Sequence, residues 1–96
     1  MGDRALSDLK VLEFGNLISA SYCGKLMADM GAEVIKIEEP DIGDEARSRG
    51  PFAQDKPGLD RSGLFAYLNT NKLSITLDPR TFLGKRIFKE LVKDYE

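Results

Sequence analysis

Two short apolar segments, residues 10–14 and 34–37, constrain the fold of this chain more than any other feature of its sequence. The first ends at Gly15 and Asn16 and the second ends before Pro40, as buried strands bounded by turn residues do. Between them, one face of a helical period carries the apolar side chains of Cys23, Leu26, Met27 and Met30. The sequence therefore predicts a βαβ unit with two parallel strands and a right-handed crossover.

The predicted helix begins at Ser19 or Ser21, where a serine side chain would cap its first turn, and it ends at Gly31. Its apolar stripe is expected to face the sheet. Cys23 lies on that stripe and away from any cluster of cations, which predicts a buried and unreactive thiol.

The rest of the chain continues the alternation of strands and helices. Residues 40–62 form a long loop rich in glycine, proline and charge, and residues 64–68 form a short helix or turn. Residues 73–77 alternate as a half-exposed strand does. A second amphipathic helix follows, N-capped by Asp78 with Pro79 in its first position. The fold class is thus α/β, and because α/β folds place another strand after such a helix, the chain is expected to be the beginning of a larger domain.

Composition excludes several classes of function. With 14 basic and 16 acidic residues the net charge is -2, so neither nucleic acid nor an anionic membrane is an expected partner. The longest uncharged run, residues 14–24, is too short to span a bilayer. Lack of histidine excludes Ser/His/Asp and Cys/His catalysis and the usual zinc sites within these residues. The single cysteine and the absence of a signal-like segment favour a cytoplasmic location.

Ligands of such sheets bind at the carboxyl ends of the strands, where the first turn is residues 15–21. A dinucleotide-binding turn needs three spaced glycines and only Gly15 is present, although Glu38 occupies the place of a ribose-binding acid. The favoured interpretation of Glu38 and Glu39 is a solvated pair at a strand end. Arg80 lies in the first turn of the predicted last helix, where the helix dipole disfavours a cation. Two interpretations stay open: an anionic ligand near Arg80, or a salt bridge to Asp78 or Glu90.

Several short motifs follow one another along the chain in a fixed order. They are residues 8–14 (DLKVLEF), residues 26–38 (LMADMGAEVIKIE), Gly43-Asp44 with Arg47, Gly50-Pro51, Leu68-Asn69, Asn71-Lys72 with Ser74, and Leu77-Asp78 with Arg80-Thr81 and Gly84. Together they resemble the N-terminal segment of the class III CoA-transferases, the family of formyl-CoA transferase and carnitine CoA-transferase, which also includes the 2-methylacyl-CoA racemases. The resemblance extends from Leu9 to about Val92.

The resemblance implies that residues 1–96 are the N-terminal portion of a large CoA-binding domain with a doubly wound, Rossmann-like parallel sheet. It also implies two full-length chains interlocked as a homodimer. In this family the segment after the third strand lines the CoA site, which transfers to Leu77, Asp78, Pro79 and Arg80. The backbone of Ser19, in the first turn, is a further candidate. Formyl-CoA transferases often have a glutamine where this chain has Ile18, and an arginine commonly stands where it has Glu39. Both departures argue against formyl-CoA transferase itself and for a family member that acts on another acid.

The reaction that the resemblance implies is transfer of CoA from an acyl-CoA to a carboxylic acid, with CoA as substrate and no permanently bound cofactor or metal. An aspartate carboxylate attacks the thioester, and this aspartate is expected outside residues 1–96, so no catalytic residue is assigned here and the segment alone is expected to be inactive. Two alternatives remain. The chain could be part of an acyl-CoA racemase or epimerase, or a noncatalytic nucleotide-binding or assembly fragment.

Overall fold

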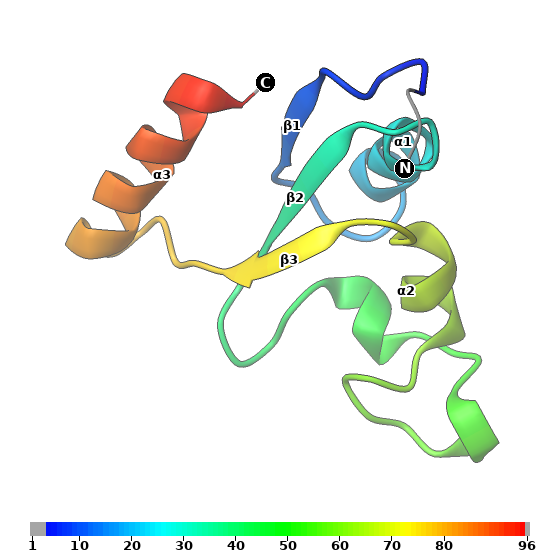
Figure 1. The fold of residues 1–96 in the computed structure, drawn as a ribbon. Helices are drawn as coiled ribbons and strands as arrows, with labels where there is room; N and C mark the ends of the chain where they lie inside the picture. Colours follow the sequence, from blue (N-terminus) through cyan, green and yellow to red (C-terminus); the bar gives the residue numbers. More distant parts are fainter. Residues whose placement is uncertain (1–3, 96) are drawn as a thin grey trace.

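The computed structural model of the chain describes residues 4–95 (Figure 1). Its three strands are β1 (Lys10–Glu13), β2 (Glu33–Glu38) and β3 (Leu73–Thr76). Its α-helices are α1 (Ser19–Asp29), α2 (Gly63–Leu68) and α3 (Phe82–Asp94). Two short 3₁₀ helices, η1 (Glu45–Ser48) and η2 (Ala53–Asp55), lie within the long segment between β2 and α2.

The strands form one parallel sheet in the order β1-β2-β3. Val11 pairs with Val34 in the β1–β2 ladder, and Ile37 pairs with Ile75 in the β2–β3 ladder. Helices α1 and α2 lie on one side of the sheet and α3 lies on the other (Figure 1). The structure confirms the predicted parallel βαβ unit and the Rossmann-like α/β class. Because all three strands are parallel, their carboxyl ends meet at one edge, where the turns after β1, β2 and β3 gather.

The apolar core lies between α1 and the sheet, and the face of α1 that builds it differs from the predicted one. Ala28, Ala32 and Val34 are buried, with Leu6, Leu9, Val11 and Met27 packed around them. The side of α1 that faces the sheet carries the small residues Ser21, Gly24 and Ala28. Cys23 is exposed, and Leu26 and Met30 are 47% and 52% exposed.

The predictions for the Cys23 stripe and for a serine cap are therefore wrong. Residue Ile18 precedes α1 without a side-chain cap, and Ser21 is fully buried instead. The physical reason is that α1 packs on charged side chains from β1 and β2. Only small side chains of α1 fit against these charged groups, and the Ser21 hydroxyl accepts a hydrogen bond from Lys36. A broad apolar stripe would supply neither the space nor the hydrogen bond.

Helix α3 begins later than predicted. Thr81 is its N-cap, since the Thr81 hydroxyl accepts a 3.0 Å hydrogen bond from the backbone of Gly84, whereas Asp78 lies in the preceding turn. Phe88 reaches the sheet side and meets Phe14 edge to face, with ring centroids 5.5 Å apart. The rest of the predicted apolar face is only partly covered, because Leu83 and Val92 are 64% and 48% exposed.

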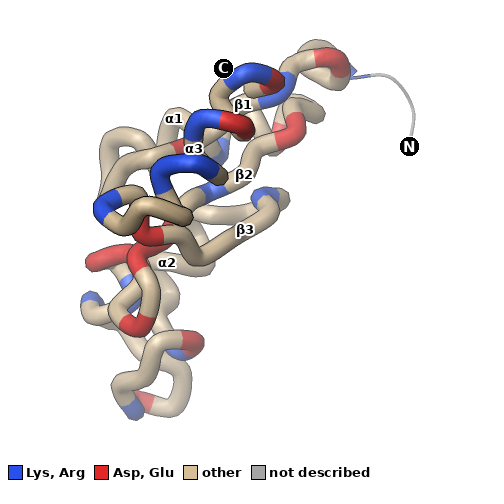
Figure 2. Tube along the Cα trace, turned by 90° about the vertical axis from the view of Figure 1, so that its left-hand side faces the viewer, with Lys and Arg blue, Asp and Glu red and all other residues tan. Residues whose placement is uncertain are grey.

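Residues of both charge signs occur throughout the fold. Figure 2 shows Lys and Arg interleaved with Asp and Glu over much of the trace, α3 included. Within residues 4–95, no helix is both long and apolar enough to cross a membrane.

Candidate functional site

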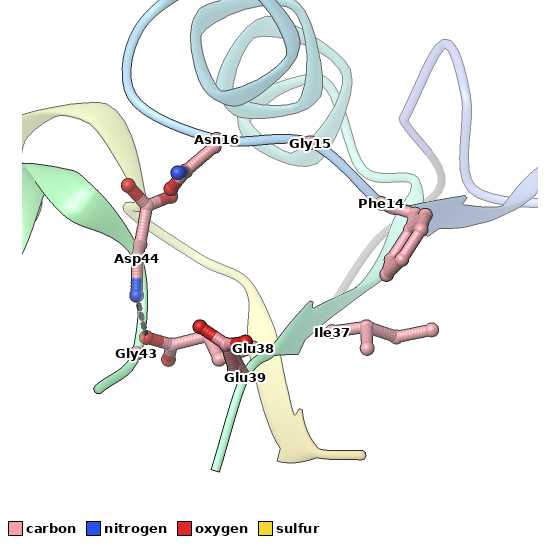
Figure 3. Close-up of a pocket in the computed structure, with 8 residues that line it drawn as sticks. All are labelled: Phe14, Gly15, Asn16, Ile37, Glu38, Glu39, Gly43 and Asp44. Atoms are coloured by element: carbon pink, nitrogen blue, oxygen red, sulfur yellow. Dashed lines mark hydrogen bonds between the residues drawn. The ribbon is translucent and has the colours of Figure 1, made fainter. Parts of the chain in front are cut away.

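Two neighbouring pockets open at the carboxyl edge of the sheet. The first, here called the Arg80 pocket, has a volume of about 240 Å³ and is lined by Phe14, Glu39, Leu77, Asp78, Pro79 and Arg80. The second, the Gly43 pocket, measures about 260 Å³ and shares Phe14 and Glu39 with the first. Figure 3 shows the Gly43 pocket as a ring of side chains, with the 14–16 turn facing Glu38 and Glu39 and with Asp44 between them. The structure thus brings together the four predicted residues 77–80 and joins them to the turn after β1.

The wall formed by residues 77–80 is fixed by a backbone hydrogen bond to β2 and by a side-chain hydrogen bond from Thr81. The Leu77 N–H donates to the Glu38 carbonyl over 3.0 Å, which carries the chain past the end of β3 beside β2. The Thr81 hydroxyl donates to the Asp78 carbonyl over 2.9 Å. A side chain at position 84 would collide with that same carbonyl, so Gly84 allows the close approach of α3 to the turn.

Arg80 is held by two carboxylates. Its guanidinium lies 2.9 Å from Asp78 Oδ1 and 2.8 Å from Glu39 Oε1. The hydrogen bond with Arg80 lowers the pKa of Asp78, and the same bond raises the pKa of Arg80. The predicted salt bridge to Asp78 is confirmed, but the second partner is Glu39 and not Glu90. The Arg80 side chain remains 72% exposed, which leaves it accessible to solvent and to ligands.

The position of Arg80 in the helix was predicted wrongly. Because Thr81 is the N-cap, Arg80 precedes α3 and does not lie in its first turn. The dipole penalty on a cation therefore gives no reason for a ligand here; the reason is the exposed guanidinium at the pocket wall.

Ser19, the remaining predicted site residue, is not brought to either pocket. It is the exposed first residue of α1 and is absent from the lining of both pockets. Its predicted role through the backbone stays a prediction.

A buried ionic cluster behind the pockets was missed by the sequence reasoning. It consists of Glu13, Lys36, Asp44 and Lys72. Lys36 Nζ lies 2.6 Å from a carboxylate oxygen of Glu13 and 2.6 Å from one of Asp44, and it donates to the Ser21 hydroxyl over 2.9 Å. Lys72 Nζ lies 2.6 Å from the other Glu13 oxygen. Two cations and two anions balance, as buried charges require.

Asp44 connects this buried ionic cluster to the pocket wall. Burial favours the neutral form of Asp44, but the hydrogen bonds from Lys36 and from the Ala46 and Leu17 backbones outweigh it and lower the pKa. The Leu17 N–H donates to Asp44 over 2.9 Å, at a residue whose φ of 66° is unusual for a leucine. The Glu45 N–H donates to the Asn16 side chain over 2.7 Å. The turn after β1 is thus held in place by the loop after β2.

Glu38 is not the solvated residue that was predicted, nor is it free to bind a ribose. It is 4% exposed, and its carboxylate accepts bonds of 2.7 and 2.8 Å from the Arg47 guanidinium. The hydroxyl of Ser74 and the N–H of Asp44 donate to it as well. These bonds, with Arg47 foremost, lower the pKa of Glu38 to about 2. Glu39, by contrast, is exposed as predicted.

Arg80 is the one cation among the residues that line the two pockets. Within residues 4–95 no group of three or more Cys, Asp or Glu side chains is arranged to hold a metal ion. The Arg80 pocket therefore combines one exposed cation, paired with two carboxylates, with apolar walls from Phe14, Leu77 and Pro79.

Comparison with known proteins finds a matching family model and relatives that are CoA-transferases. The family model described as CoA-transferase family III matches residues 6–95. The formyl-CoA:oxalate CoA-transferase of Rhodopseudomonas palustris (strain BisA53) is 42% identical over 90 residues, which are 94% of this chain and 20% of that protein. The succinyl-CoA–D-citramalate CoA-transferase of Chloroflexus aurantiacus is 43% identical over 89 residues, covering 93% of this chain and 21% of that protein.

A solved structure agrees with the sequence relatives. The crystal structure of a CAIB/BAIF family protein from Brucella suis superposes with a TM-score of 0.81 at 33% identity, over 98% of this chain and 25% of that one. The chain thus spans about a fifth of the length of the curated relatives it matches. Matched over nearly its whole length in sequence and in fold, the chain belongs to CoA-transferase family III.

Proposed function

We propose that this chain is the CoA-binding N-terminal part of an enzyme that transfers CoA from an acyl-CoA to a carboxylic acid. The observation that carries the proposal is the Arg80 pocket, which is lined both by the exposed Arg80 and by the apolar residues Leu77 and Pro79. CoA combines phosphate groups with an apolar pantetheine arm, and the pocket offers a partner to each. Membership of CoA-transferase family III supports the same conclusion.

We further propose that residues 1–96 are the N-terminal portion of a large CoA-binding domain and that the catalytic aspartate lies outside them. The enzyme works in the cytoplasm as an interlocked homodimer. CoA is a substrate that comes and goes, with no cofactor held permanently.

The binding test is calorimetric titration of CoA into the complete gene product and its Arg80→Ala variant. Loss of a charge-assisted contact worth about 1.4 kcal/mol should weaken CoA binding about tenfold. The control is Lys85→Ala, which removes an exposed cation outside both pockets and should leave the affinity unchanged. Equal CoA affinity of the parent and Arg80→Ala would remove Arg80 from the site and leave it as a surface salt bridge.

The activity test follows the movement of CoA between an acyl-CoA and added carboxylic acids. Transfer by the complete gene product is expected, and none by residues 1–96 alone, because the nucleophilic aspartate is absent from them. Transfer by purified residues 1–96 would contradict the placement of the nucleophile. Exchange of the α-proton of a branched acyl-CoA without any acceptor acid would instead indicate a racemase.

A further inference from the structure

Glu39 and Arg80 come from different strand ends and meet at the rim of the Arg80 pocket. Glu39 follows β2, Arg80 follows β3, and their charged groups lie 2.8 Å apart. Both side chains are substantially exposed, at 42% for Glu39 and 72% for Arg80. The pair therefore lies where a ligand would enter, and not within the supporting core.

Glu39 differs from the other carboxylates that line the two pockets. Glu38 is neutralised by Arg47 and Asp44 by Lys36, and both side chains are buried. Asp78 holds Arg80 from within the same turn, two residues away, because its carboxylate accepts hydrogen bonds from both the backbone N–H and the guanidinium of Arg80. Glu39 has Arg80 as its one ion-pair partner among the described residues, and it reaches Arg80 from the carboxyl end of the neighbouring strand β2. It is the carboxylate that a ligand anion can displace.

We propose that Glu39 is a specificity-determining residue that competes with the phosphate groups of CoA for Arg80, which makes phosphate binding weaker than the pocket would otherwise allow. The inference rests on the proposed function, because it takes CoA as the ligand. An incoming phosphate must break the Glu39–Arg80 pair and then lies beside the Glu39 carboxylate, so both the lost pair and the like-charge repulsion oppose it. Discrimination between ligands then depends less on their phosphate groups and more on the contacts that the rest of the ligand makes with the pocket.

The experiment is calorimetric titration of CoA into the complete gene product, its Glu39→Gln variant and its Glu90→Gln variant. Glutamine keeps the size of the side chain and removes the charge. Glu39→Gln should bind CoA about threefold to tenfold more tightly, the range expected when an exposed ion pair and a nearby like charge are removed. Glu90→Gln removes the same charge from an exposed ion pair with Lys93, outside both pockets at the sheet edge, and should not change the affinity.

Two further arms test whether Glu39 acts on phosphate and through Arg80. Pantetheine, which lacks the phosphate groups, should bind the parent and Glu39→Gln equally. In an Arg80→Ala background, the gain in CoA affinity from Glu39→Gln should shrink to less than half of the gain seen when Arg80 is present. A residue that merely supports the structure would weaken binding when changed, and would not strengthen it for the phosphorylated ligand alone.

The outcomes separate the two proposals. Equal or weaker CoA binding by Glu39→Gln, an equal gain for pantetheine, or a gain that persists in full without Arg80 overturns the role of Glu39 while CoA binding itself stands. If neither the parent nor any variant binds CoA, the proposed function fails and the role of Glu39 fails with it.

Discussion

At the scale of single residues, the buried ionic cluster carries the largest energetic consequences. Lys36 is 1% exposed and lies between two carboxylates, so its removal would leave Asp44 buried without a cation. Lys36→Met should destabilise the sheet by about 3–5 kcal/mol, the cost of breaking a buried pair by removing one partner. Amide hydrogen exchange of β1 and β2 in the complete gene product measures this loss.

Two matched variants separate charge balance from packing. The double change Lys36→Met with Asp44→Asn removes one charge of each sign and should recover at least half of the lost protection. Lys85→Met, on the exposed side of α3, should cost less than about 0.5 kcal/mol. A Lys36→Met variant as stable as Lys85→Met would show that the cluster contributes little.

Glu38 makes the stability of the fold depend on pH in the acid range. Its pKa is lowered from 4.5 to about 2, chiefly by Arg47, and a lowered carboxyl pKa in the folded state stabilises the fold above the unfolded value. The contribution is complete above about pH 5 and is lost as the pH falls from 4.5 toward 2, with a size on the order of 2–3 kcal/mol. Urea unfolding at pH 6 and pH 3 measures it.

Glu38→Gln is the variant that isolates this group. Its stability should be lower than the parent's at pH 6, and the gap should narrow toward pH 3, because below about pH 4.5 the Glu38 carboxyl of the unfolded parent binds a proton while that of the folded parent stays ionised. Tyr67→Phe, which removes an exposed hydroxyl elsewhere, should leave the pH profile unchanged. An identical pH profile for Glu38→Gln and the parent would mean that other carboxyls govern acid unfolding.

At the scale of elements, the contact of α1 with β1 depends on Gly24. A side chain at this position would collide with the Glu13 carboxylate, which holds both Lys36 and Lys72. Gly24→Ala should therefore cost about 1–3 kcal/mol, even though alanine favours a helix, because overpacking moves a buried charge. The thermal unfolding midpoint of the complete gene product is the measurement.

Gly63 provides the control for Gly24. It lies at the start of α2, where an added Cβ would meet the Pro51 carbonyl at 3.3 Å and its ring at 3.4 Å, and it is exposed. Gly63→Ala should change the midpoint by less than half as much as Gly24→Ala. A stabilising effect of Gly24→Ala would mean that α1 can move away from β1 without loss.

At the scale of the whole molecule, the 96-residue chain is open and exposes apolar surface. Its radius of gyration is 14.0 Å, whereas about 12–13 Å is usual for this length. Phe82, Leu83 and Leu73 are 80%, 64% and 58% exposed, and β3 is an edge strand. Residues 1–96 alone should therefore self-associate, with a sedimentation coefficient that rises with concentration.

The face of α3 is the expected contact in that association. Leu83→Glu should shift the sedimentation coefficient toward the monomer value, whereas Leu59→Glu, at an exposed position between η2 and α2, should not. A monomer at all concentrations with a cooperative unfolding transition would contradict the prediction.

The sequence by itself determined the order of strands and helices, the parallel sheet and the place of residues 77–80 at its carboxyl edge. The order of the elements and the parallel pairing of β1 with β2 follow from local periodicity and from turn residues, which need no knowledge of distant contacts. The wider parallel sheet and the site role of residues 77–80 were implied by the resemblance to the class III CoA-transferases. The family was also recognisable from its motifs. Only the tertiary structure decided which face of α1 is buried, where Glu38 and Lys36 find their partners, and that Glu39 closes on Arg80. Charged residues inside strands, such as Lys36, were the available signal for buried pairs, but their partners lie at positions 13, 44 and 72, which only the folded chain brings together.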